Sequence, residues 1–495
     1  MSFELETATA DASTLRRVAI DPVSRVEGHG KVTLLLDEND IVQQVRLHIV
    51  EFRGFEKFIQ GRPYWEVPVM VQRLCGICPV SHHLAASKAL DHVVGAPRLT
   101  PAAEKLRRLD ALRPDPAVAR AAFLPPLVAR SSLRFRKSEV GKRNIVGVAA
   151  AYPEVAKQGV LLRKFGQEVI RLTAGKRIHG TGAQFPAASI GRSRVKSATA
   201  CWLMSTRPSP GAVTRCIWSG DCIMPTRGCT TNSAASVRTF FDRRRQRREL
   251  DFYDGTLRVR DADGQIIVDG VDVQNYQQLI REEVKPWSYM KFPYLGFLGP
   301  DEGWYKVGPL ARVQNCDFIP SPLAEDERRT FVDYGKGGLI QAPLAYHWAR
   351  MIEMRHAAET IKDLLNDDDI SGSELMASGA HRREGIGVIE APRGTLLHHY
   401  QVNDDDLVTM CNLIVSTTHN NQPMNEAVRR VAKRYLSGRK LTEGLLNHIE
   451  VAIRAFDPCL SCATHALGKM PLQVTLLDAE GRELDRRCTS ADGGY

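Results

Sequence analysis

The sequence predicts an α+β fold that is mostly helical, with a small N-terminal β-sheet. Residues 17–50 alternate apolar and polar positions, as strands with one buried face do. Apolar residues then recur at helical spacing from 66 to 94, and later helices are predicted at 344–365, 424–437 and 442–456. With 495 residues, 43% of them hydrophobic, the chain can bury a sizeable core.

The N-terminal sheet is predicted to contain a hairpin. In KVTLLLDENDIVQQVRLHIV, the residues Asp37-Glu38-Asn39-Asp40 separate two β-rich runs. Asp and Asn favour tight turns because their side chains can bond the nearby backbone. We therefore expect two paired strands joined at this turn.

The helical segments have recognisable breaks and ends. Pro79 interrupts the segment 66–94 directly after two cysteines, because proline lacks a backbone donor. Gly438 follows 424–437, and the run Asn366-Asp367-Asp368-Asp369 follows 344–365. A last β-like run, PLQVTLLD, precedes a polar tail.

The formal net charge of +10 is distributed unevenly. Residues 111–137 carry six Lys or Arg against one acid, and residues 183–248 carry twelve against two. The rest of the chain is therefore mildly acidic. A nucleic-acid partner usually requires a basic face spread over the fold, so we predict none.

The same two stretches lack helical or strand periodicity, and the second is rich in Arg, Ser, Thr, Pro and Cys. They can be interpreted as irregular insertions, as disordered basic segments, or as products of locally shifted reading frames. We favour shifted frames, because regular sequence resumes abruptly on both sides.

No run of residues approaches the roughly 20 apolar positions that a bilayer helix needs. The N-terminus MSFELETATADAS is polar and partly acidic, unlike a signal peptide. Arg16-Arg17 precedes Asp21, Arg25 and Glu27 instead of the apolar run of a twin-arginine signal. We expect a cytoplasmic protein with no membrane partner.

Two CxxC pairs stand out among the eleven cysteines: Cys75 with Cys78, and Cys459 with Cys462. Four convergent thiolates can hold zinc, an iron–sulfur cluster or nickel. The cysteine pairs of structural zinc modules usually lie about 12 to 20 residues apart. More than 380 residues separate these two pairs, which disfavours such a module.

The residues that flank the pairs are more specific. The first pair stands in RLCGICPVSH, with Arg73 before it and His82 after it, and the second stands in DPCLSCATH, between Asp457 and His465. Together these motifs resemble the two signatures of nickel–iron hydrogenase large subunits. The resemblance implies the fold of that family, with a central helix bundle where the two cysteine segments meet.

The resemblance covers 17–110, about 138–182 and 249–478, and it fails over the two basic stretches. It is closest to the large subunit of the soluble, bidirectional NAD-reducing hydrogenases, judging by EFRGFEKFIQGRPYWEVPVMVQRLCGIC, PWSYMKFPYLGFLG and EAPRGTLLHHY.

The resemblance implies a nickel–iron centre. Cys75 and Cys459 are expected as terminal ligands of nickel. Cys78 and Cys462 are expected to bridge nickel to an iron that also carries carbon monoxide and cyanide. Polarisable thiolates suit such a pair of metals.

Two further positions match proton-handling residues of the family. Cys459 is expected to take up the first proton, and Glu27, in RVEGHG, to relay it outward. Burial can raise the pKa of a carboxyl towards neutrality, as this relay needs. The alternative for Glu27 is a surface salt bridge with Arg25 or His29.

Other matches surround the centre. Arg393, in EAPRGT, matches an arginine above the metals, where its permanent charge can orient hydrogen or the diatomic ligands; the alternative is an ion pair with Asp457. Glu56, in RGFE, and His465 match the ligands of a magnesium ion. His82 is expected to orient a cysteine sulfur.

The C-terminus resembles that of an unprocessed precursor. In the family an endopeptidase cuts after the histidine of the second motif once nickel is inserted. The resemblance implies cleavage between His465 and Ala466, which would make 1–465 one catalytic domain and 466–495 an extension removed on maturation. The alternative is a C-terminal β-run that is never removed.

Electrons are expected to leave through other chains. The remaining seven cysteines form no cluster-binding series, and no GxGxxG follows a predicted strand. The resemblance places iron–sulfur clusters in a small hydrogenase subunit, and FMN and NAD in diaphorase subunits. Nickel-insertion proteins and the maturation endopeptidase are further expected partners.

The predicted activity is the reversible heterolytic cleavage of dihydrogen, with electrons passed to NAD. One alternative is a hydrogen-sensing regulatory subunit, which is not expected to carry a processed tail. A second alternative is a subunit related to respiratory complex I, which is expected to lack the four cysteines. A third is a zinc-stabilised binding protein, which metal analysis would distinguish.

Overall fold

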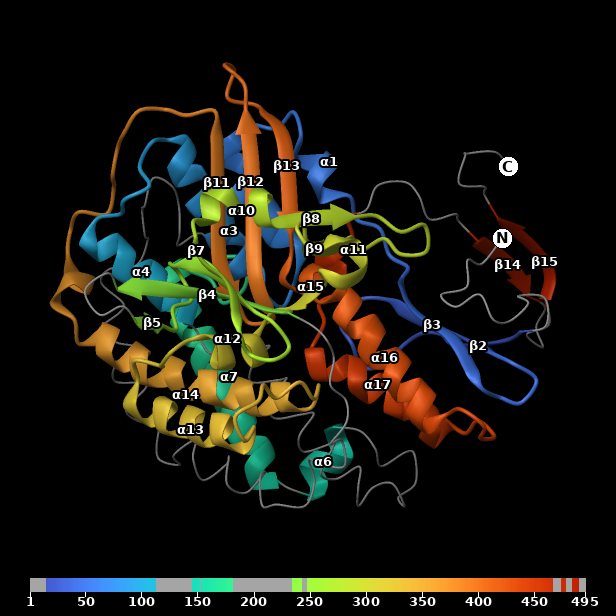
Figure 1. The fold of residues 1–495 in the computed structure, drawn as a ribbon. Helices are drawn as coiled ribbons and strands as arrows, with labels where there is room; N and C mark the ends of the chain where they lie inside the picture. The colour runs from blue at the N-terminus through green and yellow to red at the C-terminus, as the bar shows by residue number, and fades with distance from the viewer. Residues whose placement is uncertain are drawn as a thin grey trace.

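Helices and small, mostly antiparallel sheets build this protein (Figure 1). The computed structural model describes residues 15–112, 145–151, 153–180, 234–242, 247–465, 473–477 and 483–488. Over these residues helices outweigh strands, so the mostly helical α+β fold is confirmed. None of the described helices is both long and apolar enough to cross a membrane.

The helices fall into three groups by length and type. The longer helices are α3 (Pro79–Val93), α4 (Pro101–Leu112), α7 (Pro153–Ala174), α13 (Pro322–Tyr334), α14 (Ala345–Leu365), α16 (Asn421–Tyr435) and α17 (Glu443–Phe456). The shorter helices are α1 (Phe55–Ile59), α2 (Val67–Val71), α6 (Ile145–Ala151), α10 (Tyr276–Leu279), α11 (Gly299–Glu302), α12 (Pro309–Asn315) and α15 (Ser416–His419). The 3-10 helices are η2 (Tyr64–Glu66), η3 (Gln72–Leu74), η5 (Val273–Asn275), η6 (Asp368–Ser371) and η7 (Ser461–Ala463).

The strands form five sheets in the described chain. The first sheet contains β1 (Arg16–Ile20), β2 (Gly30–Leu36) and β3 (Val42–Ile49). The second contains β4 (Ala234–Asp242), β5 (Arg247–Glu249), β6 (Thr256–Arg260), β7 (Ile266–Val271) and β10 (Tyr305–Lys306). The third contains β11 (Glu384–Ala391), β12 (Gly394–Val402) and β13 (Val408–Ile414). The two pairs are β8 (Ile280–Glu283) with β9 (Phe292–Leu295), and β14 (Gln473–Leu477) with β15 (Glu483–Cys488).

The predicted N-terminal hairpin is confirmed as β2 and β3. The Asp37 side chain accepts hydrogen bonds from the backbone N–H groups of Asn39 and Ile41, both at 2.9 Å, which closes the turn. Strand β1 adds a third, antiparallel strand. Helix α16 packs on β3, and the backbone N–H of Gly438 donates to the Asp40 carbonyl, so the end of α16 is tied to this turn.

The predicted helical segment 66–94 is divided where the first cysteine pair stands. Helix α2 and η3 precede Cys75, and α3 begins at Pro79, directly after Cys78. Proline is tolerated in the first turn of a helix because its missing N–H has no helical partner there. The break therefore leaves both cysteines in a short connection at the start of a buried helix.

Sheet β11–β13 lies against α3 at the centre of the molecule (Figure 1). A Cβ atom at Gly385 or Gly387 would lie 2.0 or 2.1 Å from a backbone oxygen of α3, so glycine permits this close approach. This sheet was not predicted from the sequence, although two β-rich runs flank Pro392-Arg393-Gly394.

The three predicted C-terminal helices are confirmed as α14, α16 and α17. Helix α17 begins at the cap Thr442, whose side chain accepts from the Leu445 N–H, and it ends at Asp457 in a left-handed conformation. This conformation turns the chain into the segment that carries the second cysteine pair. Helix α12 packs on α14, α14 packs on α17, and α17 packs on α16.

Most of the two basic stretches lies outside the described residues, so their interpretations stay predictions. Residues 234–242 are an exception, because they form β4 and pair with β6. A strand is therefore present in this part of 183–248, although its sequence lacks strand periodicity. The run SVRTFF contains β-branched and aromatic residues that favour strands, and pairing with β6 completes its hydrogen bonds.

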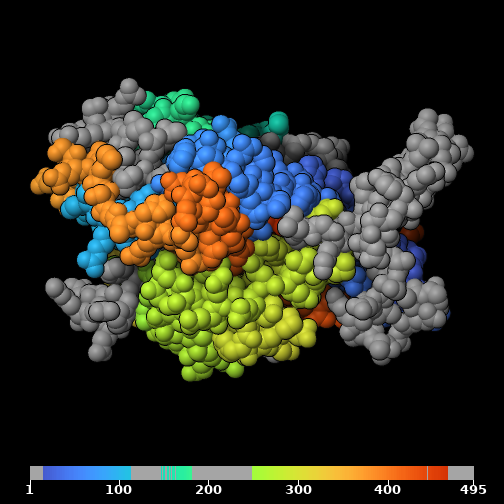
Figure 2. Space-filling view, turned by 90° about the horizontal axis from the view of Figure 1, so that it is seen from above, coloured from blue at the N-terminus to red at the C-terminus, as the bar shows by residue number. Residues whose placement is uncertain are grey.

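The C-terminal β-like run is confirmed as β14, and a second strand, β15, pairs with it inside the predicted polar tail. Figure 2 shows segments distant in sequence side by side on one face: N-terminal residues in blue, residues beyond 250 in green, and residues near 400 in orange.

Candidate metal centre

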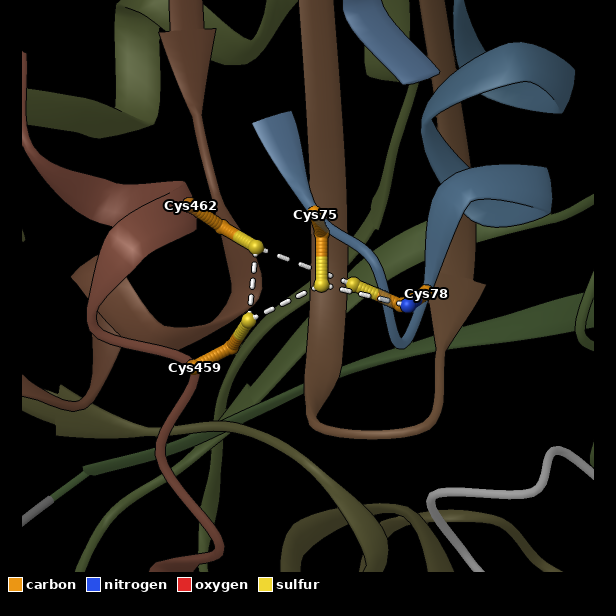
Figure 3. Close-up of side chains that lie close together, drawn as sticks. All are labelled: Cys75, Cys78, Cys459 and Cys462. Atoms are coloured by element: carbon orange, nitrogen blue, oxygen red, sulfur yellow. Dashed lines mark hydrogen bonds between the residues drawn. The ribbon is translucent and has the colours of Figure 1, made fainter. Parts of the chain in front are cut away.

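The four cysteines of the two CxxC pairs meet in the structure (Figure 3). Their Sγ atoms all lie within 4.8 Å of one another. The Sγ–Sγ distances are 3.2 Å from Cys75 to Cys459, 3.7 Å from Cys78 to Cys462, and 2.6 Å from Cys459 to Cys462. All four are free of disulfides and at most 7% exposed. The predicted convergence of the two ends of the chain is thus observed.

Local backbone geometry fixes the sulfur atoms. The Sγ of Cys75 accepts hydrogen bonds from the N–H groups of Ile77 and Cys78, at 3.2 and 3.1 Å. On the other segment, the Cys459 N–H donates to the Thr417 hydroxyl at 2.9 Å. Backbone donors favour a thiolate at Cys75, and the Thr417 contact anchors the second pair.

The thiols differ in their electrostatics. Hydrogen bonds from the other three thiols lower the pKa of Cys75, whereas burial raises the pKa of Cys459 and Cys462. Four thiolates cannot all be stable in one buried space without a cation, because like charges repel at these distances. The donor set therefore fits soft metal ions, and it fits nickel and iron as well as zinc.

Arg393 lies beside the four cysteines, on the β11–β12 turn. Its Nε donates to the Asp457 carbonyl at 2.5 Å, and its Nη2 lies 3.1 Å from the Asp457 carboxylate. Burial lowers the pKa of Arg393, but Asp457 and the cysteines Cys459, Cys78 and Cys75 outweigh this effect and raise it. The alternative ion pair with Asp457 is thus present, and it coexists with a position next to the sulfurs.

One atom of Arg393 has no partner in the described chain. Its Nη1 is buried and makes no hydrogen bond. Buried donors are nearly always paired, so an unpaired guanidinium donor beside four thiols indicates a place for a polar or reacting group. In a structural zinc site protein ligands fill all four coordination positions, so a free donor beside it has no group to bind. The unpaired Nη1 therefore indicates a reactive centre.

Glu27 lies against the second cysteine segment. Its backbone forms a β-bridge with Cys459, its carbonyl accepts from the Leu460 N–H at 3.1 Å, and its Oε2 accepts from the Ser461 N–H at 3.1 Å. A Cβ at Gly28 would lie 2.7 Å from the Ser461 nitrogen, so glycine is needed for this approach.

The alternative salt bridges of Glu27 are not observed. Arg25 donates to Asn447, and His29 pairs with Glu51 at 3.1 Å. The carboxylate of Glu27 is therefore held by backbone rather than by either cation.

Glu56 and His465, the predicted magnesium ligands, are both buried. The Oε1 of Glu56 accepts from the Leu413 N–H at 2.8 Å and from the Lys291 ammonium at 2.9 Å. His465 Nε2 donates to the Cys462 carbonyl at 2.8 Å, and its buried Nδ1 has no partner in the described chain. Burial, with the nearby charge of Lys291, lowers the pKa of His465 to about 3. A neutral imidazole with an unpaired nitrogen suits a cation.

His82 is fully buried and joins a chain of hydrogen bonds. Its Nδ1 lies 3.2 Å from His398 Nε2, and His398 Nδ1 lies 2.6 Å from the Tyr400 hydroxyl. The role of His82 towards a cysteine sulfur stays a prediction.

Several residues around the centre were not predicted from the sequence. Lys291 contacts Glu56, Thr417 anchors Cys459, and Arg312 contacts the turn before Arg393. No short motif marks these residues, because each acts through a contact between segments distant in sequence.

The chain matches two family models. One, described as HoxL-like, covers residues 17–52, and the other, described as nickel-dependent hydrogenase, covers residues 53–112 and 245–465. The second alone spans more than half of the chain. The chain belongs to the nickel-dependent hydrogenase family. The residues matched include both cysteine pairs.

Individual proteins similar to this chain are also named as hydrogenases. The hydrogenase is 41% identical to the NAD-reducing hydrogenase HoxS subunit beta of Cupriavidus necator, over 95% of this chain and 99% of that protein. It is 36% identical to a chain of the F420-non-reducing hydrogenase of Methanothermobacter marburgensis, over 94% of this chain and 98% of that protein.

Solved structures share the fold of this hydrogenase. The crystal structure of an NAD+-reducing [NiFe]-hydrogenase in the H2-reduced state matches with a TM-score of 0.79 and 50% identity, over 91% of this chain and 99% of that chain. A Ni-Fe-Se hydrogenase from D. vulgaris Hildenborough, at 21% identity and a TM-score of 0.65, shows the fold alone. The predicted family, fold and hydrogenase activity are confirmed, and the group of four cysteines fits the metal site of an oxidoreductase that acts on dihydrogen.

Proposed function

We propose that this chain is the catalytic subunit of a hydrogenase that passes electrons from dihydrogen to NAD through partner subunits. The observation that carries the proposal is the group of four buried sulfur atoms, drawn from both ends of the chain, beside the unpaired Nη1 of Arg393. A nickel–iron centre with carbon monoxide and cyanide on its iron would supply the redox chemistry of hydrogen cleavage.

The cysteines divide into two roles in this proposal. Cys75 and Cys459, the first of each pair, would hold nickel alone. Cys78 and Cys462, the second of each pair, would hold both nickel and iron. The match of both motifs to the family supports this division. The convergence of both pairs in one buried space supports a single centre.

The protein residues handle the proton and the charge. The sulfur of Cys459 accepts the proton, and Glu27, whose backbone pairs with Cys459, carries it away from the centre. The Ser461 N–H holds the Glu27 carboxylate in place. Arg393 keeps a charged donor beside the sulfurs, and Asp457 prevents that side chain from turning away.

We further propose that a magnesium ion is held by Glu56 and His465. The buried, unpaired Nδ1 of His465 and the carboxylate of Glu56 supply a nitrogen and oxygen ligands. Glu282, which like Glu56 pairs with Lys291, supplies a second carboxylate near this site. A hard divalent cation usually keeps several waters in such a site.

Maturation and partners follow from the same assignment. Cleavage between His465 and Ala466, by an endopeptidase acting after the nickel-insertion proteins, would leave His465 as the C-terminus. Flavin-containing diaphorase subunits, together with a small iron–sulfur subunit, would carry electrons to NAD in the cytoplasm. The similarity to NAD-reducing hydrogenases supports these partners.

Infrared spectroscopy of the matured complex tests the proposal, together with hydrogen-dependent NAD reduction. We expect absorption bands of metal-bound carbon monoxide and cyanide, and steady NAD reduction under hydrogen. A complex that contains zinc and shows no such bands would contradict the nickel–iron centre. Bands with little turnover would instead favour the hydrogen-sensing role.

A further inference from the structure

The turn that carries Arg393 is held from behind by a second buried arginine. Arg312, on α12, is completely buried. Its Nη1 donates to the Ala391 carbonyl at 2.9 Å and its Nη2 to the Pro392 carbonyl at 3.3 Å. These are the two carbonyls immediately before Arg393, so Arg312 contacts the backbone that directs the Arg393 side chain.

The same guanidinium binds two buried carboxylates. Its Nε and Nη2 donate to the two oxygens of Glu353, on α14, at 2.6 and 2.7 Å. Its Nη1 also donates to Glu390 Oε2 at 2.7 Å. The planar fork of arginine can make these contacts together, whereas the ammonium of lysine presents a single charged nitrogen.

Glu390 links Arg312 to the other strand of the hairpin. Its second oxygen accepts from the Thr395 hydroxyl at 2.7 Å, and Thr395 stands directly opposite Glu390 in the β11–β12 register. Both strands that flank the turn are therefore connected to one arginine.

The backbone packing leaves the turn little room to move. A Cβ at Gly308 would lie 2.7 Å from the Arg393 carbonyl oxygen, and a Cβ at Gly394 would lie 2.3 Å from the Val307 side chain. Both glycines have positive φ angles, of 97° and 140°. The segment before α12 thus packs directly against the turn, and Arg312 fastens the same helix to it.

We propose that Arg312 is a positioning residue for hydrogen cleavage: with Glu353 and Glu390 it fixes the 391–393 backbone, so that Arg393 keeps its unpaired Nη1 beside the cysteines. This inference rests on the proposed role of Arg393. A displacement of about 1 Å of a reacting group can cost about a hundredfold in rate, which gives such a support functional weight.

A double-mutant cycle tests the inference in the matured complex. The variants are Arg312→Lys, Arg393→Lys and both together, compared by kcat for hydrogen-dependent dye reduction. Nickel and iron per chain are measured in every sample, so that lost metal is not mistaken for lost positioning. If Arg312 acts through Arg393, its substitution should cost about tenfold alone and almost nothing in the Arg393→Lys background.

The possible outcomes are distinct. If the losses of the two single variants multiply in the double variant, Arg312 acts independently and the inference fails, while the role of Arg393 stands. If Arg393→Lys alone leaves kcat unchanged, both the proposed role of Arg393 and the inference fail.

A matched control and a milder variant complete the design. Arg107 is equally buried and binds Asp91 through two hydrogen bonds, but it lies on α4. Arg107→Lys should lower stability, and any loss of kcat should multiply with that of Arg393→Lys.

Thr395→Val is the variant to use if Arg312→Lys does not load metal, because it removes only the hydrogen bond to Glu390. It should lower kcat about threefold alone and almost not at all in the Arg393→Lys background. A loss that multiplies with that of Arg393→Lys, or no loss at all, would overturn the inference.

Discussion

Arg393 and Glu27 both lie next to Cys459, and each is held in place by contacts with other residues of the chain. In Arg393, Nε and Nη2 bind Asp457 while Nη1 has no partner in the described chain. In Glu27, the backbone pairs with Cys459 and the carboxylate accepts from Ser461. Fixed donors and acceptors lose little freedom when a reaction proceeds, which is the physical basis of their proposed roles.

Glu27→Gln should lower hydrogen-dependent dye reduction about a hundredfold or more, because an amide accepts the Ser461 N–H but cannot carry a proton. Nickel and iron contents should stay unchanged. Glu51→Gln is the control, since Glu51 is a nearby carboxylate paired with His29. Equal activity of Glu27→Gln and the unsubstituted enzyme would refute the relay.

Cys78→Ser should reduce nickel and iron per chain at least about tenfold, because a hydroxyl is a poor ligand for these soft metals. Cys411→Ser is the matched control: Cys411 is also buried and free, and it lies outside the four-cysteine group. Mass spectrometry of metals in the purified complex makes the comparison. Full metal content in Cys78→Ser would exclude this cysteine as a ligand.

The sequence located the four cysteines because motif and spacing identify them without a structure. It could not locate Lys291 or Arg312. Lys291 becomes significant only when β9 approaches β13 and Glu56, and Arg312 only when α12 meets the β11–β12 turn. Contacts of this kind depend on the whole fold and leave no local pattern.

The element that presents the first cysteine pair is α3, and its position depends on β11. Gly385 and Gly387 let β11 approach the backbone of α3 more closely than any other residue would. This contact connects the helix that begins directly after Cys78 to the hairpin that carries Arg393. The relative position of both is therefore set by packing between two elements.

Gly387→Ala should lower the free energy of unfolding by about 1–3 kcal/mol, because the new Cβ would lie 2.1 Å from the Ala85 carbonyl oxygen and must push α3 away. Gly444→Ala is the control, since its Cβ would meet only a side-chain atom at 4.0 Å and alanine favours the helix. Thermal unfolding of both variants gives the measurement. An unchanged transition in Gly387→Ala would show that α3 and β11 are not so tightly packed.

Sequence periodicity predicted the β2–β3 hairpin and helices α14, α16 and α17. It did not predict β11–β13. In β11 and β12 almost every residue is buried, so polar positions do not alternate. Buried strands of this kind resemble buried helices in sequence. Strand β4 was missed for a related reason, because its pairing with β6, and not its own periodicity, defines it.

At the scale of the whole molecule, the two ends of the chain hold each other in place. The Ser24 N–H donates to Glu450, on α17, at 2.8 Å, and the end of α16 bonds to the turn of the N-terminal hairpin. The Leu460 N–H donates to the Glu27 carbonyl beside the cysteines. The metal centre thus requires a complete fold, because neither end can position its cysteines alone.

Maturation should remove residues 466–495 from this fold. Mass spectrometry of active enzyme is expected to show a chain that ends at His465, and protein produced without nickel is expected to keep the extension. Active enzyme with the extension intact would contradict cleavage and would favour a permanent β14–β15 hairpin.

X-ray absorption at the nickel edge of the matured complex tests the central claim most directly. We expect nickel surrounded by sulfur, with an iron atom close by, and loss of this signal in Cys78→Ser. A chain that contains no nickel, or that binds one zinc through all four sulfurs, would contradict it.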